Sequence, residues 1–266
     1  MPFQTIKHIF FVSILLTSTA CSDNTTVGTD TDNDGDGIAN DIDTDDDNDG
    51  IEDSEDNFPL DAIAFEDENF ARCVKSALIS NQVDRLSEIT FLKCPSMSIS
   101  RITHLSAFPS LTHLKLSGNQ LTKIDITQNT ALMQLDLRNN KLTDIDATQN
   151  TALTQLDLYN NKLTEIDVTQ NTALTQLDLR YNQLTEIDVT QKTALTHLAL
   201  RGNQLTEIDV TPNTALTYLD LATNKLTEVD ITQNTALTGL YLRDNPLSQE
   251  TIYYLRTIDW INDLSW

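Results

Sequence analysis

Leucine and other apolar residues return with a fixed period over most of the chain. From Leu111 onward the sequence follows a 21-residue unit, L-T-x-L-x-L-x-x-N-x-L-T-x-I-D-V-T-Q-N-T-A, seven times without a gap. Positions 4, 6 and 11 of the unit are always Leu; in the first six units, position 14 is Ile or Val, position 16 is Ile, Val or Ala, and position 21 is Ala. A single unit is too short to bury these side chains, so we expect stacked units that share one continuous core.

Each unit also predicts one short strand. If the leucines at positions 4 and 6 point into the core, then positions 3, 5 and 7 point outward and position 8 follows at the strand's end. Position 9 is Asn in all seven units, and a buried amide is costly unless it is hydrogen-bonded. We therefore expect a ladder of hydrogen bonds to the backbone of the neighbouring turn, formed by Asn119, Asn140, Asn161, Asn182, Asn203, Asn224 and Asn245.

The unit resembles the leucine-rich-repeat signature L-x-x-L-x-L-x-x-N-x-L. Its short second half is similar to a bacterial subclass with 21-residue repeats and to internalin-like surface proteins. The resemblance covers residues 89–247, comprising one degenerate and seven regular repeats. It implies an α/β solenoid with a parallel β-sheet on its concave face.

Both ends of such a solenoid need a cap. Within residues 65–88, apolar residues at helical spacing predict an N-terminal helical cap, and residues 248–266 form the expected C-terminal cap. In the latter we expect a helix from Ser248 to Ile258, with Trp260 and Trp266 covering the last open edge. The N-terminal helix face consists of Phe70, Cys73, Val74, Ala77 and Leu78; in the degenerate repeat, Ile89, Leu92 and Cys94 take strand positions and Met97 replaces the asparagine.

Residues 1–20 are typical of an export signal. Lys7 precedes an apolar run, Ile9 to Leu16, that is too short to span a bilayer, and small residues follow it. The segment resembles a bacterial lipoprotein signal, which implies that Cys21 is lipidated. Ser18 departs from that pattern, so ordinary secretion remains the alternative.

The three cysteines fit the same interpretation. If Cys21 carries lipid, Cys73 and Cys94 remain as a pair, which an oxidising compartment would allow to form a disulfide. That bridge would join the capping helix to the first strand. Two buried free thiols are the alternative.

Acidic residues dominate the charge of the chain and concentrate in residues 21–64. The formal net charge is −23, and no Lys or Arg occurs between His8 and Arg72. This charge disfavours nucleic acid or an anionic membrane surface as a partner, because phosphate binding depends on Lys and Arg. Membrane contact is expected through a lipid anchor only.

Two stretches of the acidic segment match a twelve-position calcium loop. Each has a D-x-D-x-D triplet followed by a glycine, which permits the tight turn, and a residue at position seven that would donate its backbone carbonyl. The loops start thirteen residues apart, too close for paired EF-hands, and resemble thrombospondin type 3 repeats. We expect a calcium-binding stalk, with an acidic disordered spacer as the alternative. The expected ligands are Asp32, Asp34, Asp36, Ile38, Asn40, Asp43, Asp45, Asp47, Asp49, Ile51, Asp53 and Asp56.

Positions 3, 5, 7 and 8 are where the repeats differ most from one another. All four belong to the expected concave face, which indicates either a binding role or neutral drift on a solvated surface. Tyrosines and arginines, which are enriched at interfaces, favour binding. The residues we expect to contact a ligand are Asp157, Tyr159, Asp178, Arg180, Tyr181, Arg201 and Tyr218.

A row of carboxylates on this face has two interpretations. Asp136, Asp157 and Asp178 would stack at the strand spacing of about 4.8 Å, and arginines two residues further on can neutralise them. The row is thus either an ion-pair lattice or a site for a cation or polyhydroxyl ligand. An enzyme is not expected, because His113 and His197 lie four strands apart and nothing in the pattern raises the pKa of one carboxylate above another.

A second acidic column occupies position 15, two residues before a threonine. Asp in such a turn usually accepts hydrogen bonds from nearby backbone. A regular Asp/Thr lattice for an ordered surface such as ice is the less favoured alternative. The column comprises Asp125, Asp146, Asp167, Asp188, Asp209 and Asp230.

Together these features predict a monomeric recognition protein that binds a protein or glycan through its concave face. It would be held at the bacterial outer membrane or cell surface through Cys21, or else be secreted. The alternative is a structural envelope or matrix protein that associates only with itself.

Overall fold

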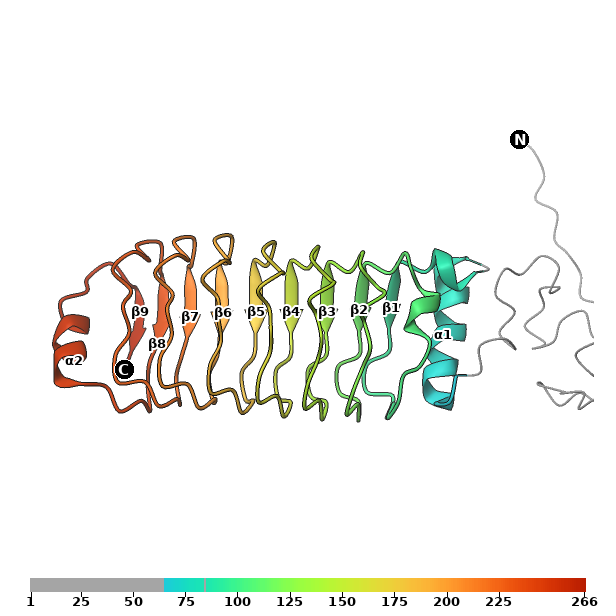
Figure 1. Ribbon diagram of the computed structural model, residues 1–266, viewed down its shortest axis with the longest axis horizontal. Helices are drawn as coiled ribbons and strands as arrows, with labels where there is room; N and C mark the ends of the chain where they lie inside the picture. Colours follow the sequence, from blue (N-terminus) through green and yellow to red (C-terminus); the bar gives the residue numbers. More distant parts are fainter. Residues whose placement is uncertain (1–64, 84) are drawn as a thin grey trace, which may run out of the picture.

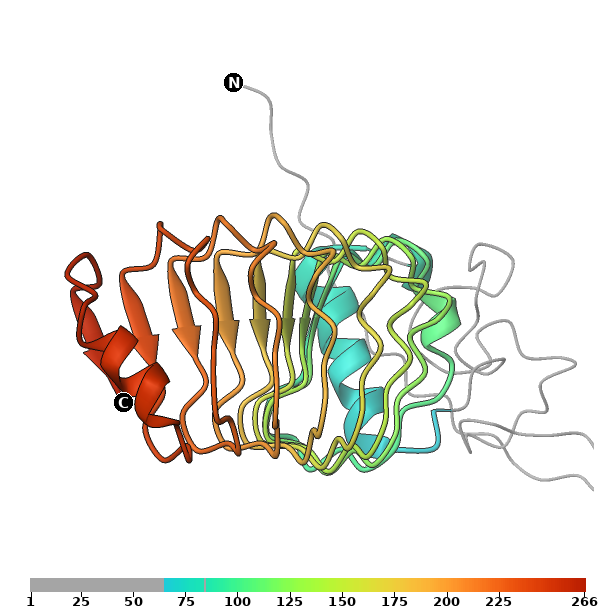
Figure 2. The ribbon, with the colours of Figure 1, turned by 60° about the vertical axis from the view of Figure 1, so that its left-hand side comes forward.

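The computed structural model describes residues 65–83 and 85–266, which form one solenoid (Figure 1). In this part of the chain nine short parallel strands make a single sheet in chain order, one strand per turn (Figure 2). The strands are β1 Phe91–Lys93, β2 His113–Lys115, β3 Gln134–Asp136, β4 Gln155–Asp157, β5 Gln176–Asp178, β6 His197–Ala199, β7 Tyr218–Asp220, β8 Gly239–Tyr241 and β9 Asp263–Ser265. The helices are α1 Glu68–Asn81 and α2 Gln249–Leu255, with short 3₁₀ turns η2 Leu86–Glu88 and η3 Leu105–Ala107.

The sheet is in register with the repeat. Gln134 of β3 lies opposite Gln155 of β4, which in turn lies opposite Gln176 of β5, so equal positions of successive units stack on one another. The leucine at the centre of every strand from β1 to β8 is buried. The predicted solenoid with a parallel sheet is therefore confirmed.

The core is a stack of leucine columns. Leucines at positions 1, 4 and 6 are buried in all seven units, and those at position 11 in the first six. The prediction that the alanines at position 21 join this core is wrong: Ala131 is half-buried and Ala152 is exposed. These alanines occupy the turn just before the strand, so their side chains face solvent, and the leucines at position 1 fill the space instead.

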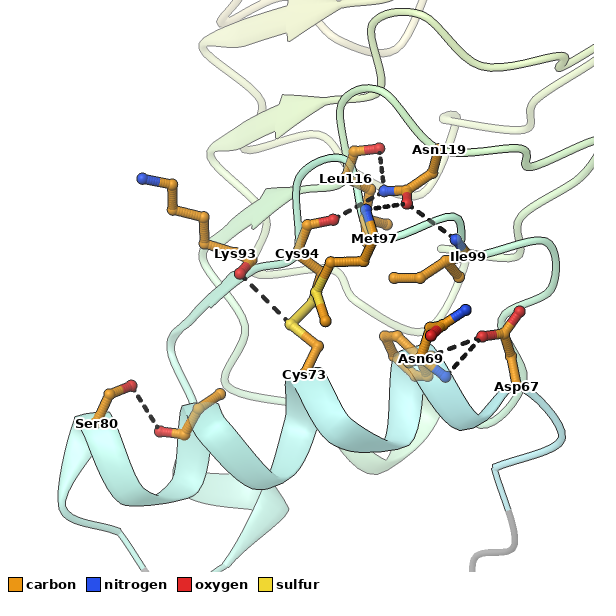
Figure 3. The surroundings of a disulfide bond; sticks show 12 residues. Asp67, Asn69, Cys73, Ser80, Lys93, Cys94, Met97, Ile99, Leu116 and Asn119 are labelled. Carbon is orange, nitrogen blue, oxygen red and sulfur yellow. Dashed lines mark hydrogen bonds between the residues drawn. A yellow bond between two sulfur atoms is a disulfide. The ribbon is translucent and has the colours of Figure 1, made fainter.

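The expected asparagine ladder at position 9 is present. In Asn182, for example, Nδ2 donates to the carbonyl oxygens of Leu158 and Leu179, both at 3.0 Å, and Oδ1 accepts from the backbone N–H of Leu163 at 3.1 Å. Each amide thus satisfies backbone groups of its own turn and of the preceding one. In Figure 3 the first member, Asn119, reaches back to Cys94, Met97 and Ile99 of the degenerate repeat.

A second asparagine ladder, which the sequence analysis did not identify, runs at position 19. Its side chains are fully buried, and each Nδ2 donates to two backbone carbonyls of the preceding turn, as Asn171 does to Ala147 and Asn150. Their Oδ1 atoms accept no hydrogen bond. The ladder comprises Asn129, Asn150, Asn171, Asn213 and Asn234, and Lys192 interrupts it.

Helix α1 lies against β1 at the N-terminal end of the solenoid (Figure 1). Asp67 begins the helix by accepting from the backbone N–H groups of Asn69 and Phe70. A disulfide between Cys73 of α1 and Cys94, which follows β1, joins the helix to the first turn (Figure 3). The expected apolar face, namely Phe70, Cys73, Val74, Ala77 and Leu78, is the buried face of the helix; Leu92 lies in β1, while Ile89 and Cys94 are buried on either side of it.

The C-terminal end differs from the expectation. Ser248 begins α2 by accepting from the N–H of Thr251, but the helix ends at Leu255 and not at Ile258. The edge of β8 is not left for the tryptophans to cover, because β9 pairs with it; Trp260 remains 40% and Trp266 42% exposed. The edge is a row of backbone hydrogen-bonding groups that needs a backbone partner, and β9 provides it by pairing parallel to β8.

The expected signal, the lipidated Cys21 and the twelve calcium ligands lie outside the described residues and stay predictions. Within residues 65–83 and 85–266, no helix is long and apolar enough to cross a membrane.

Candidate functional site on the sheet face

The outward side chains at positions 3, 5 and 7, together with position 8, form a surface that we call the sheet face. A shallow hollow of about 380 Å³ lies over it and extends from Lys115 on β2 to Tyr218 on β7. The strands place these side chains in straight rows, because the register repeats every 21 residues.

In the centre of the sheet face, arginines neutralise the row of carboxylates. Arg138 binds Asp136 through Nε at 3.0 Å and Nη2 at 2.9 Å, and its Nε also lies 3.3 Å from Asp157. Arg180 binds Asp178 in the same way, with Nε at 2.9 Å and Nη2 at 2.5 Å. The structure thus contains the ion-pair lattice that was one of the two interpretations of this row.

Two tyrosines lie beside the ion-pair lattice: Tyr159 takes the place of an arginine, and Tyr181 directly follows Arg180. Tyr159 stands where the neighbouring units have arginine; the Arg180 guanidinium lies 5.2 Å from its ring centre, and Tyr181 meets it edge-on at 5.5 Å. Tyr181 has a left-handed backbone, with φ of 54°, and its ring lies against Gly202. A Cβ at Gly202 would approach the Tyr181 ring to 2.8 Å, so the glycine makes room for it.

The carboxylates of the row differ in their electrostatics, which corrects an expectation. Burial and the nearby charge of Asp178 raise the pKa of Asp157 to about 6, although Arg138 lowers it. Burial also raises the pKa of Asp220, which is 3% exposed. Tyr159 and Ala222 take the place of arginine two residues after these carboxylates, so each lacks the two-bonded partner that Asp136 and Asp178 have.

We expect Asp157→Asn to raise the free energy of unfolding by about 1 kcal/mol at pH 7, because the variant removes a half-buried charge. Because the folded-state pKa of Asp157 is raised, the stability that its protonated form contributes is fully present below pH 3.8. This contribution is lost as pH rises through about 6. Urea unfolding should therefore show wild type becoming more stable from pH 7 toward pH 4, with a smaller gain for the variant. Asp136→Asn is the matched control and should lower stability by about 1 kcal/mol, because it breaks a two-bonded ion pair.

The C-terminal part of the sheet face is aromatic. His197 and Tyr218 lie opposite each other on β6 and β7, with rings stacked at 5.9 Å and 19°. Tyr241 meets Tyr218 at 5.4 Å above Gly239, the residue opposite Tyr218 on β8. The row of position 5 carboxylates is broken here by Ala199.

The structure brings the predicted ligand residues together in two groups. Tyr159, Tyr181, Asp157, Asp178 and Arg180 form one cluster over β4 and β5. Arg201 and Tyr218 belong to the aromatic part, whose other members, His197, Ala199, Asp220 and Tyr241, were not among the predicted ligand residues. Ala199 interrupts the otherwise regular aspartates at position 5, and this interruption is the sequence signal that could have identified the aromatic part of the site.

The second acidic column takes part in turns, as predicted. In Asp167, for example, Oδ1 accepts from the backbone N–H of Thr169 at 2.8 Å and from its hydroxyl at 2.7 Å. These hydrogen bonds lower the pKa of that carboxylate. The same pair of hydrogen bonds occurs at Asp125, Asp146, Asp188 and Asp209.

Comparison with known proteins agrees with the geometry. Residues 109–150, 130–171 and 151–192 match the family model described as Leucine Rich repeats (2 copies). A search of curated proteins gives no match. Among solved structures, the functional domain of InlJ from Listeria monocytogenes is similar, with 41% identity and a TM-score of 0.67 over 70% of this chain and 42% of that one.

Two further structures extend the comparison. A leucine-rich-repeat protein from Leptospira interrogans is 26% identical, with a TM-score of 0.54 over 60% of this chain and 50% of that one. Internalin C2 from Listeria monocytogenes shares the fold, with 23% identity and a TM-score of 0.67 over 76% of this chain and 93% of that one. The chain spans half or less of the InlJ and Leptospira chains. Residues 109–192 of the chain thus match leucine-rich repeats, and its parallel-sheet solenoid is similar to those of InlJ and internalin C2.

Proposed function

We propose that the chain is an exported bacterial surface protein that recognises a protein or glycan through its sheet face. The observation that carries the proposal is the position of the variation between repeats. Core and turn positions keep the same residue types from unit to unit, whereas positions 3, 5, 7 and 8 change. These positions form the hollowed face, where tyrosine and arginine, residue types enriched at interfaces, gather over β4 to β8.

The similarity to internalin structures supports a recognition role and export. In the proposal, a lipid on Cys21 holds the protein at the outer membrane, and residues 21–64 bind calcium and keep the solenoid away from the bilayer. A calcium-loaded segment would be compact and stiff, because the metal neutralises carboxylates that otherwise repel one another.

A glycan array and a protein pull-down with the full chain test the proposal. The double variant Arg180→Ala/Tyr181→Ala removes the guanidinium and the ring that border Tyr159. We expect it to lose at least tenfold in affinity for the captured ligand, because side chains at an aromatic and arginine contact commonly account for more than 1.4 kcal/mol of binding.

Gln183→Ala/Glu186→Ala is the matched control. Both residues are exposed and lie beyond position 8 of the same repeat, so this variant should bind as wild type does. Thermal unfolding of both variants would show that they remain folded. Equal capture by the sheet-face variant and wild type would contradict the proposal, as would a chain that captures only copies of itself and grows in size with concentration.

A further inference from the structure

The row of position 5 residues on the sheet face has a gap at Ala199. From β3 to β5 the row is Asp136, Asp157 and Asp178, and it resumes with Asp220 on β7. Ala199 is 7% exposed and lines the hollow over the sheet. Between Asp178 and Asp220 the surface therefore drops to the level of a methyl group.

The gap leaves one arginine without the partner that its equivalents have. Arg138 and Arg180 each bind the Asp two residues earlier with two nitrogen atoms. Arg201 occupies the same position of its unit, but the residue two places earlier is Ala199. Among the described residues the Arg201 side chain forms no hydrogen bond or ion pair, although its charge acts on Asp220 and Tyr218, so its N–H donors can bind a ligand.

The residue opposite Ala199 is a buried carboxylate with spare acceptor capacity. Asp220 pairs in register with Ala199 and is 3% exposed. Its Oδ1 accepts from the backbone N–H of Ala222 at 3.1 Å, and within residues 65–83 and 85–266 its Oδ2 accepts nothing. Oδ2 itself is not enclosed by the protein, so it can accept from a donor supplied from outside.

An aromatic surface borders the gap on the side away from Arg201. His197 and Tyr218 lie two residues before Ala199 and Asp220, and they point to the same face of the sheet. Their rings are nearly parallel, and Tyr241 extends the surface across β8. The gap at Ala199 is thus bordered by aromatic rings, a carboxylate and a guanidinium that has no hydrogen-bonded carboxylate of its own.

We infer that this gap is a subsite for one neutral sugar residue of a glycan. A sugar hydroxyl both donates and accepts, so it can donate to Asp220 and accept from Arg201, while the C–H face of the ring packs on Tyr218. An anionic group would be repelled by Asp220 and an ammonium group by Arg201, while Asp178 and Arg180 neutralise each other. The subsite rests on the proposed function and decides between its two ligand classes in favour of a glycan.

Ala199→Asp in the full chain is the decisive test. The variant restores the aspartate that β3 and β5 carry at this position and fills the gap. The new carboxylate would also lie two residues before Arg201, where it can bind the guanidinium. On an array of neutral and sialylated oligosaccharides, wild type should bind neutral glycans, and the variant should bind them at least tenfold more weakly. The control is Glu207→Gln, which changes an exposed residue that lies after the strand, at position 13 of the same repeat. This variant should bind as wild type does.

A second variant, Arg201→Gln, removes no side-chain hydrogen bond or ion pair among the described residues and should lose at least fivefold in affinity for the same glycan while the protein stays folded at the assay temperature. The inference is overturned if wild type binds no neutral glycan at millimolar concentration, or if either variant binds it as tightly as wild type. If wild type captures a protein or a charged glycan, and only Arg180→Ala/Tyr181→Ala loses it, the subsite is wrong while the proposed function stands.

Discussion

Asn182→Ala should lower the free energy of unfolding by about 3–5 kcal/mol, since each buried group left without its hydrogen bond costs about 1–3 kcal/mol. The side chain is 8% exposed and bonds three backbone groups, the carbonyls of Leu158 and Leu179 and the N–H of Leu163. These groups belong to two successive turns, so the loss weakens the interface between repeats, on which solenoid stability depends.

Urea unfolding followed by circular dichroism measures this effect. Gln183→Ala, at the adjacent exposed position, is the control and should change stability by less than about 0.5 kcal/mol. Asn171→Ala in the second ladder should cost about 1–3 kcal/mol, because its Oδ1 accepts nothing and only two hydrogen bonds are lost. A larger loss for Asn171→Ala than for Asn182→Ala would contradict the ranking of the two ladders.

The two ladders show where prediction from the sequence succeeds and fails. The inward direction of position 9 was predicted from its constant asparagine in the repeat signature, because strict alternation would turn this odd position outward with positions 3, 5 and 7. Position 19 lies in the segment T-Q-N-T, where asparagine usually indicates a solvent-facing turn. Asn171 points inward because the backbone of each solenoid turn curves back toward the sheet. That curvature depends on contacts between successive turns, which the sequence pattern does not show. The misplaced alanines at position 21 have the same cause.

The candidate site was predictable in outline and not in detail. Variation between repeats identified the sheet face, and the rows of Asp136 and Arg138 follow directly from strand register. The unequal environments of Asp157 and Asp178 did not follow, because they depend on which neighbour supplies an arginine and how deeply each carboxylate is buried. Nor did the left-handed backbone at Tyr181, which is a property of position 8 in the folded coil.

Lys192 is the one break in the second ladder. It is fully buried, and its Nζ donates to the carbonyl oxygen of Thr169 at 3.4 Å. Burial lowers the pKa of this amine, although Asp188 and Asp167 act in the opposite direction. An ammonium group thus occupies a column that elsewhere holds neutral amides, and the two carbonyls of the preceding turn that an amide would bind at this position lack that donor.

Lys192→Asn should therefore raise the free energy of unfolding by about 2–3 kcal/mol at pH 7. Asn171 donates to the carbonyls of Ala147 and Asn150, so an asparagine at position 192, one repeat later, would donate to the carbonyls of Val168 and Asn171. Each of these two hydrogen bonds contributes about 1 kcal/mol, and a buried charge is removed.

The pH dependence separates these two contributions. A lysine whose folded-state pKa is lowered binds fewer protons folded than unfolded, so wild type gains stability as pH rises from that lowered value toward 10.5. The advantage of Lys192→Asn over wild type should be largest at neutral pH and shrink toward pH 10, leaving the part due to hydrogen bonds. Lys162→Asn, an exposed lysine-to-asparagine change, should alter stability by less than about 0.5 kcal/mol. A Lys192→Asn protein no more stable than wild type at pH 7 would show that the column gains nothing from a continuous amide ladder.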